Sequence, residues 1–215
     1  RSACNYILKD LPRTKFNNNS HCISYVHFKK LLIHNSNMLG AALLARTYSF
    51  TKEDELFNES KKAMQFACDS QLSDGSWYYG EEPEYHWIDN WHTAYNLDSL
   101  KCYTDNTNDT SYVENLKKGY AFFKDNFFTS DGRAKFYHDR LRFVDIQSAA
   151  QAIDTLCYFK DNDGLKLAIK IANWTIDNMQ DDKGYFYYRD LGWKKVKIPM
   201  LHWGQATMFS ALSNL

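Results

Sequence analysis

The sequence predicts an all-α protein made of repeated helix hairpins, an incomplete α/α toroid. Four leucines lie 56 residues apart, each in a segment of helical composition: Leu44, Leu100, Leu156 and Leu212. Fixed self-similarity at this scale is typical of repeat architectures. Two kinds of helix also alternate along the chain, one apolar on nearly all sides and the other apolar on one side. Inner helices surrounded by outer helices account for both observations.

The leucine-bearing segments are the predicted inner helices. They read HNSNMLGAALLARTY, DNWHTAYNLDSLKCY, VDIQSAAQAIDTLCY and LHWGQATMFSALSNL. A helix without a polar face is buried on both sides. The segments that follow carry apolar residues at spacings of three and four, as in Leu165, Ala168 and Ala172. This one-sided pattern is typical of a helix that covers a core and leaves its other face in water.

Each predicted outer helix ends at a turn with glycine, followed by an aromatic run. The three segments are LSDGSWYYG at 72–80, TSDGRAKFYHD at 129–139 and DDKGYFYYRD at 181–190. Glycine supplies the positive φ needed to stop a helix and reverse the chain. We interpret the aromatic runs as loops. Because they all join an outer helix to the next inner helix, we expect them at one end of the fold, beside the inner-helix N-termini.

The period divides the chain into three repeats within one predicted domain, residues 1–215. The repeats span approximately 33–88, 89–144 and 145–200, with half-repeats at both ends. Because the chain starts with Arg and six helix pairs are expected for a full toroid, we expect further N-terminal repeats in a longer protein.

Composition limits the partners. The formal net charge is zero, with 26 basic and 26 acidic residues, which argues against nucleic acid or a membrane surface. No apolar stretch is long enough to span a bilayer. The five cysteines are dispersed and the histidines lack metal-ligand spacing, so we expect reduced thiols, a cytoplasmic location, no metal and no cofactor.

Aromatic residues are in excess, with 6 Trp, 15 Tyr and 14 Phe, and many fall in the loops. One interpretation is a lid over the ends of the inner helices. The other is a cleft whose walls stack on sugar rings, since Tyr and Trp combine a flat apolar face with a polar group. On the second interpretation the candidate substrate-binding residues are Trp77, Tyr78, Tyr79, Trp87, Trp91, Tyr137, Arg142, Tyr187, Tyr188, Trp203 and Gln205.

Polar residues occupy matching positions at the start of the inner helices. Asp89 aligns with Asp145, and each directly precedes an inner helix. Such residues commonly cap helices. Two carboxylates at one end of the fold also have the arrangement that general acid–base chemistry requires. Nearby histidines complete the candidate catalytic set: Asp89, His92, His138, Asp145 and His202.

Several segments resemble a family of bacterial proteins found with polysaccharide-biosynthesis genes. They are DGSWYYGEE, WIDNWHTAYNLDSL, KFYHDRLRFVDIQSAAQAIDTL, NMQDDKGYFYYR and LHWGQATMFSAL. The resemblance implies a fold related to the toroids of squalene cyclases and protein prenyltransferases. Gln147 stands where the family pattern has His, and neither the DxDD acid motif of squalene cyclases nor the zinc ligands of prenyltransferases are present. Fold likeness alone transfers neither activity.

The sequence therefore predicts a carbohydrate-active protein of polysaccharide metabolism or biosynthesis that acts on a carbohydrate or sugar-linked substrate. As an enzyme it would be a metal-independent epimerase, lyase or hydrolase. A non-catalytic carbohydrate- or protein-binding scaffold is the alternative from another class. An isoprenoid-binding protein is a third, since toroids of this kind offer an apolar hollow.

Overall fold

The protein is helical, as predicted. The computed structural model describes residues 1–215 and contains eight α-helices with only short strands. Contacts group the chain into two compact units. The first comprises Arg1–Ile88 and Tyr95–Phe122, and the second comprises Asp89–Ala94 and Phe123–Leu215.

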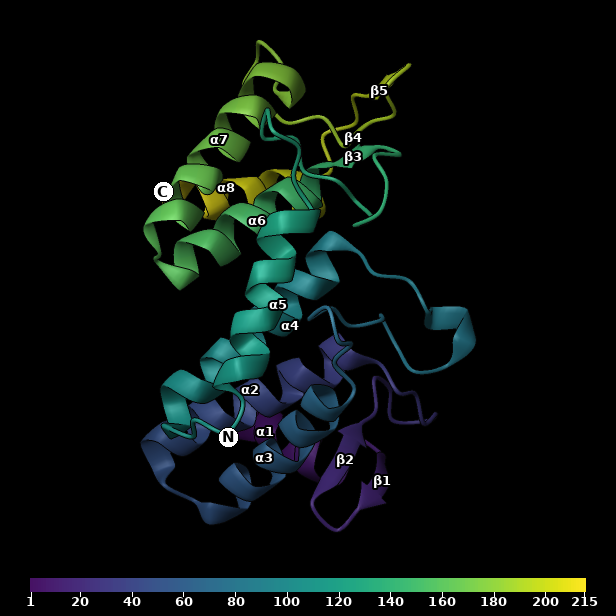
Figure 1. The fold of residues 1–215 in the computed structure, drawn as a ribbon, viewed down its shortest axis with the longest axis vertical. Coiled ribbons are helices and arrows are strands. Elements are labelled where there is room, and N and C mark those ends of the chain that lie inside the picture. The colour runs from purple at the N-terminus through teal and green to yellow at the C-terminus, as the bar shows by residue number, and fades with distance from the viewer. The chain divides into compact units, whose positions relative to one another are not determined.

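The first unit is a layer of helices with a β-hairpin beside it (Figure 1). Helices α2 and α3 form an extensively packed hairpin, α1 packs on α2, and strand β2 packs on α3. The elements are α1 (Ser2–Lys9), β1 (Arg13–Asn17), β2 (Ser20–Ile23), α2 (His34–Thr51), α3 (Asp54–Asp69) and the 3₁₀ turn η1 (Pro83–Tyr85). The hairpin β1–β2 is antiparallel, with Thr14 opposite Cys22.

Two further helices, α4 (Asn90–Thr107) and α5 (Val113–Asn126), contribute to both units. In the first unit they approach closely at Gly119. A Cβ atom there would lie 2.7 Å from Cζ3 of Trp77 and 2.9 Å from Cδ2 of Leu97. Glycine is therefore the residue that lets the indole of Trp77 fit between these helices.

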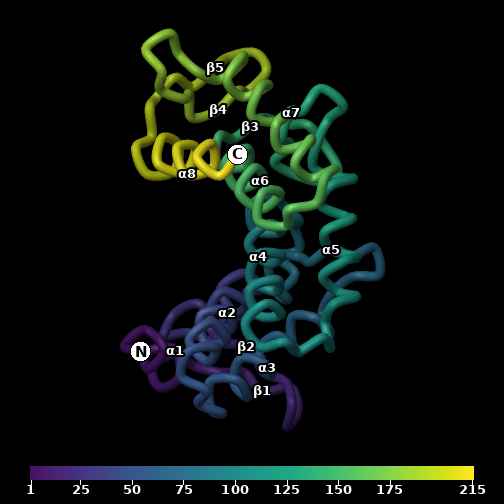
Figure 2. The backbone as a smooth tube through the Cα atoms, turned by 90° about the vertical axis from the view of Figure 1, so that its left-hand side faces the viewer, coloured from purple at the N-terminus to yellow at the C-terminus, as the bar shows by residue number.

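The second unit is built around α6, which packs against both α7 and α8 (Figure 2). A three-stranded antiparallel sheet in the order β3–β4–β5 lies at the start of α6. The elements are β3 (Val144–Asp145), α6 (Ile146–Phe159), α7 (Asn162–Met179), β4 (Arg189–Asp190), β5 (Lys195–Val196), the π-helix η2 (Leu201–Ala206) and α8 (Thr207–Ser213). The interpretation of the third aromatic run as a loop was therefore wrong at its end, where Arg189 and Asp190 form a short strand.

The repeated leucines occupy core positions in three of the four helices. Leu44, Leu100 and Leu156 are each 0% exposed, whereas Leu212 on α8 is half-buried. Helix α6 is buried on nearly every side, as expected for an inner helix. The prediction of a helix buried on all sides thus holds for α6 and is wrong for α8, which buries only Met208 and Ala211 and leaves Phe209 exposed.

The chain reversals also repeat. After each predicted outer helix a glycine has positive φ, 94° at Gly75, 96° at Gly132 and 89° at Gly184. Each of these amides donates to the carbonyl three residues earlier, which closes a tight turn. The predicted use of glycine at these three turns is confirmed.

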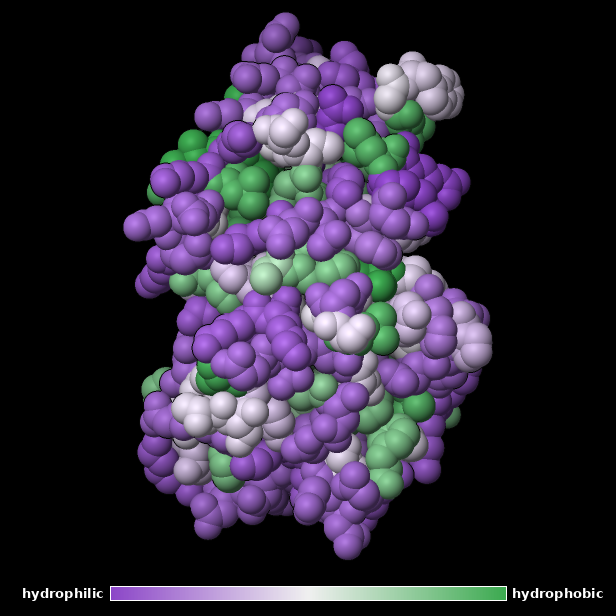
Figure 3. Space-filling model, viewed as in Figure 1, coloured by the Kyte–Doolittle hydropathy of each residue, from purple (hydrophilic) through white to green (hydrophobic).

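The surface is mixed in polarity, with apolar side chains exposed in the region of α7 and α8 (Figure 3). Phe209 on α8 is 78% exposed and Ile169 on α7 is 52% exposed. No helix combines the length and the apolar character that crossing a membrane requires.

Candidate functional site

The aromatic loops join the inner helices in the same way three times. The first amide of each inner helix donates to a carbonyl of the following loop, and the residue before the helix forms a β-bridge with the next loop residue. The amide bonds are His34 to Tyr79 (3.1 Å), Asn90 to Phe136 (2.9 Å) and Ile146 to Tyr188 (3.1 Å). The bridges are Ile33–Gly80, Asp89–Tyr137 and Asp145–Arg189. Within each unit, the aromatic loops therefore lie beside inner-helix N-termini, as predicted.

Asp89 and His92 form a dyad at the start of α4. Oδ1 of Asp89 accepts from the backbone amide of His92 at 3.0 Å, so the carboxylate caps the helix. Its Oδ2 lies 2.7 Å from Nδ1 of His92. Asp89 is 2% exposed, while the His92 side chain is 19% exposed. A carboxylate that accepts from Nδ1–H holds the imidazole in the tautomer whose lone pair is on Nε2, as a general base requires.

Aromatic rings surround this dyad in the second unit. Trp91 stacks on His92 with centroids 4.6 Å apart, and its edge contacts Trp203 at 6.2 Å and Phe136 at 6.5 Å. Trp203 is 44% exposed. The indole groups therefore present apolar surface to solvent beside a polar dyad, a combination suited to a sugar ring.

Asp145 occupies the equivalent position before α6 and has a different partner. Its Oδ1 accepts from the amide of Gln147 at 3.0 Å, and its Oδ2 accepts from Nε of Arg189 at 2.5 Å. The Arg189 guanidinium lies over the rings of Tyr188 and Phe143. Burial raises the pKa of Asp145, although Arg189 opposes the shift; Asp89 adds a smaller effect in the same direction as burial.

Arg189→Gln should destabilise the second unit at neutral pH, because it leaves the buried Asp145 carboxylate without its counter-charge. We expect a loss of about 1–3 kcal/mol in the free energy of unfolding. A carboxyl group whose pKa is raised by folding stabilises the fold below its ordinary pKa of 3.8, and this contribution is lost as the pH rises through the folded-state pKa. The variant should therefore match the parent protein in acid and fall behind it towards neutral pH.

Chemical denaturation at a series of pH values tests this expectation. Arg140→Gln is the matched control, since Arg140 also lies over a tyrosine ring but pairs only with the exposed Asp139. A pH-independent deficit in Arg189→Gln would contradict the assignment of the effect to Asp145.

The remaining candidate catalytic residues lie in the same unit but in different settings. The His138 ring meets Phe127 edge-on at 6.4 Å, and its carbonyl accepts from the ammonium of Lys135. His202 is exposed on the π-helix and packs on Trp203 at 4.6 Å. Arg142, a candidate substrate-binding residue, is exposed on the loop before β3. The 2.7 Å contact between Nδ1 of His92 and Oδ2 of Asp89 makes the dyad the best-defined part of the set.

Three candidate binding residues in the C-terminal part of the chain, Gln205, Tyr187 and Tyr188, make different contacts. Gln205 uses both ends of its amide on the backbone of Phe186, at 2.8 Å each, and so fixes the loop. Tyr187 is 7% exposed and its hydroxyl donates to Asp181. Tyr188 lies beneath Arg189 at 4.5 Å. For Gln205 and Tyr187 these contacts favour a structural role over the substrate-binding role expected from the sequence.

Four candidate aromatic residues lie in the first unit. Trp77 is 1% exposed, and its indole N–H donates to the carbonyl of Ala67 at 2.7 Å, so it is a core residue with no face for a ligand. Tyr79 stacks on Trp87 at 4.7 Å, and Tyr78 stacks on His86 at 4.2 Å. The interpretation of the aromatic runs as a lid over the core therefore fits Trp77, while the other three form paired stacks.

Two charged residues that lie beside inner-helix N-termini were not among the residues predicted from the sequence. Arg189 pairs with Asp145, and Glu81 lies 2.7 Å from Nε2 of His34. The hydrogen bond from His34 lowers the pKa of Glu81. Arg189 directly follows an aromatic run in FYYRD, and Glu81 follows one after a single glycine in YYGEE; these positions were the available signal.

No family model matches the sequence, and no curated protein matches it either. Solved structures do match the fold. An inactive variant of the α-1,6-mannanase of Salegentibacter sp. HEL1_6, solved with α-1,6-mannotriose, has a TM-score of 0.74 at 13% identity. The match covers 100% of this chain and 61% of the mannanase chain. The cellobiose 2-epimerase of Bacillus thermoamylovorans B4167 has a TM-score of 0.71 at 10% identity, with 90% and 57% covered.

The unsaturated glucuronyl hydrolase of Bacillus sp. GL1 has a TM-score of 0.61 at 15% identity, with 84% of this chain and 57% of the hydrolase covered. The chain thus spans about three-fifths of the length of these structures. All three are carbohydrate-active enzymes with the α/α-toroid fold. The fold is an α/α toroid.

Proposed function

We propose that this chain is part of a carbohydrate-active enzyme whose acid–base group is the Asp89–His92 dyad. The observation that carries the proposal is the buried carboxylate bonded to Nδ1 of a partly exposed imidazole. Epimerisation, elimination and hydrolysis of sugars all need a proton moved at a carbon or a glycosidic oxygen, and a histidine oriented in this way can act as the group that moves it.

The surroundings of the dyad support a sugar rather than another small molecule. Trp91 and the half-exposed Trp203 offer flat apolar faces beside polar groups, which suits the stacking of a pyranose ring. In this proposal the charged pair of Asp145 and Arg189 orients the substrate hydroxyl groups. The structural neighbours, which act on mannans, cellobiose and glucuronyl sugars by their names, agree with this substrate class.

The finer assignment rests on the sequence resemblance. We place the chain with the bacterial polysaccharide-biosynthesis-associated proteins that its segments resemble, and its substrate among polysaccharides or their sugar-linked precursors. The five cysteines are all free, which supports a reducing compartment such as the cytoplasm.

The test is turnover on a small panel chosen from the neighbours: cellobiose, α-1,6-mannotriose and an unsaturated glucuronyl oligosaccharide. Nuclear magnetic resonance of the anomeric protons reports epimerisation, elimination and hydrolysis in one experiment. We expect one sugar class to be converted, with loss of conversion in His92→Gln. Binding without conversion would favour the alternative, a non-catalytic carbohydrate-binding scaffold, for which the exposed Trp203 is the supporting observation.

A further inference from the structure

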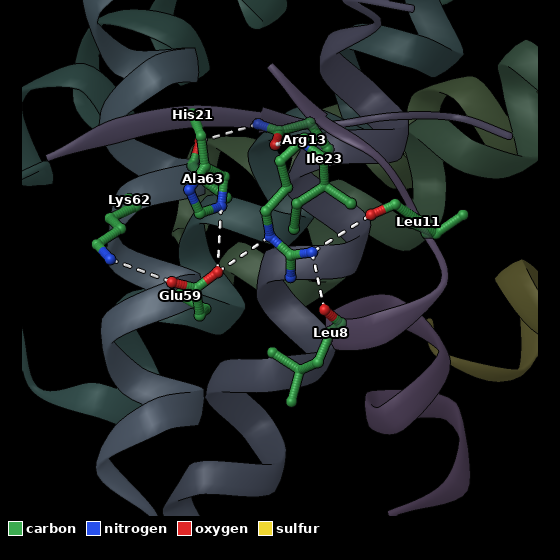
Figure 4. Close-up of polar contacts among 9 residues, drawn as sticks. Leu8, Leu11, Arg13, His21, Ile23, Glu59, Lys62 and Ala63 are labelled. Atoms are coloured by element: carbon green, nitrogen blue, oxygen red, sulfur yellow. Dashed lines mark hydrogen bonds and ion pairs between the residues drawn. The ribbon is translucent and has the colours of Figure 1, made fainter. Parts of the chain in front are cut away.

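A second polar cluster lies in the first unit, between the hairpin β1–β2 and helix α3 (Figure 4). It lines a cavity of about 310 Å³, at the lower end of the usual size of small-molecule sites. Its charged and titratable residues come from three elements: Arg13 and Lys15 from β1, His21 from β2, and Glu59 and Lys62 from α3.

The donors of this cluster converge on one carboxylate. Nε of Arg13 lies 3.0 Å from Oε2 of Glu59, and Nζ of Lys62 donates to Oε1 of Glu59 at 3.1 Å. Nε2 of His21 lies 3.8 Å from Oε2 of Glu59, too far for a hydrogen bond. Glu59 is the only acidic side chain that lines the cavity, against three permanent cations.

Two donor groups remain without a partner. His21 is 3% exposed, and neither its Nε2 nor Nη2 of Arg13 has a hydrogen-bond partner, although both atoms are buried. Buried polar groups in native proteins are nearly always satisfied, so each such group requires an explanation. The guanidinium is held in place, because its Nη1 donates to the carbonyls of Leu8 (3.0 Å) and Leu11 (3.3 Å).

The electrostatic environment is short of negative charge. Burial lowers the pKa of His21 to about 4; Glu59 opposes this shift, and Arg13, Lys62 and Lys15 reinforce it. The cations exceed the single carboxylate by two charges. A dianion with several terminal oxygens would match both the charge and the unpaired donors, whereas a carboxylate ligand brings one charge and two oxygens.

We propose that this cavity binds a phosphate dianion, free or as the monoester group of a small molecule, with Arg13, His21 and Lys62 as donors. Glu59 is the internal anion that competes with the phosphate for these donors, and it must turn aside on binding. The side chain is 21% exposed, so it has solvent on one side into which to turn. This site is independent of the sugar-binding proposal, since no residue is shared.

Isothermal titration with inorganic phosphate, glucose 1-phosphate and glucuronate tests the proposal. We expect saturable binding of the two phosphates at millimolar or lower concentration and weaker or no binding of glucuronate. Equal binding of the two phosphates assigns the free ion, and tighter binding of glucose 1-phosphate assigns the ester. Glucuronate binding as tight as phosphate, or no saturable phosphate binding, would overturn the proposal.

Two substitutions should move the affinity in opposite directions. Lys62→Gln removes a charge-assisted donor and should weaken phosphate binding about tenfold. Glu59→Gln removes the competing anion and should tighten it. The matched controls are Lys117→Gln and Glu114→Gln, because Lys117 and Glu114 form the same i,i+3 pair on the surface of α5. Equal effects in the control pair would show a general charge effect and overturn the site.

The imidazole of His21 gives a second measurement that does not depend on a variant. An added dianion should raise the pKa of His21 from about 4, against the opposing charges of Arg13, Lys15 and Lys62. Proton resonances of the ring, followed through a pH titration with and without phosphate, report this change. A titration curve unmoved by saturating phosphate would contradict a contact with His21.

Discussion

Asp89→Asn should reduce turnover by about 10² to 10⁴ while the protein stays folded. Asn retains the capping bond to the amide of His92, so the helix should lose only a few tenths of a kcal/mol. Its NH₂ group cannot accept from Nδ1–H of His92, so the imidazole must take the other tautomer or turn away. Steady-state rates on the sugar found in the panel, together with unfolding by denaturant, measure both effects.

A second aspartate that caps a helix serves as the control that separates catalysis from helix capping. Asp161 caps α7 by accepting from the amide of Gly164 at 2.9 Å, and it is not one of the candidate site residues. Asp161→Asn should therefore leave turnover unchanged, with the same small change in stability. Full activity in Asp89→Asn would make Asp89 a helix cap alone, and the dyad would be withdrawn as the acid–base group.

The register of the fold could be predicted from the sequence because it depends on local patterns. A 56-residue period placed His34, Asn90 and Ile146 at matching helix starts, and each donates to the aromatic loop that follows. The positive-φ glycines at Gly75 and Gly132 follow from turn chemistry. Such features need only a few neighbouring residues to be recognised.

The partners of the aligned carboxylates could not be predicted in the same way. Asp145 meets Arg189 across 44 residues, through strands of two residues each, and strands that short carry no hydrophobic alternation. His92 was recognisable as a partner of Asp89 because residues three apart are neighbours on a helix. Long-range pairs of loop residues depend on the packed structure, which composition does not encode.

The burial of individual rings in the aromatic runs could not be predicted from the sequence either. In SWYYG the sequence does not say which ring faces the core, and Trp77 proves to be buried while its neighbours Tyr78 and Tyr79 form stacks. The deciding residue is Gly119, more than forty positions away, which leaves room for the indole. A candidate binding residue in an aromatic loop therefore needs its burial known before a role is assigned.

Trp77→Ala should destabilise the protein by about 3–5 kcal/mol, the usual cost of removing a buried aromatic side chain. The indole fills the space beside Gly119 and Leu97, and its N–H satisfies the carbonyl of Ala67. Trp77→Phe should cost less, since it keeps part of the volume but leaves that buried carbonyl without its partner, about 1–3 kcal/mol. Equilibrium denaturation followed by circular dichroism measures both changes.

The control is Trp193→Ala, because Trp193 is 81% exposed and should contribute within about 0.5 kcal/mol. If Trp77 lined a sugar-binding cleft, Trp77→Ala would weaken sugar binding with little change in stability. The burial of Trp77 predicts the opposite pattern, a large loss of stability, with unchanged affinity of the fraction that remains folded. Weakened sugar binding at unchanged stability would therefore contradict the core position and return Trp77 to the candidate binding residues.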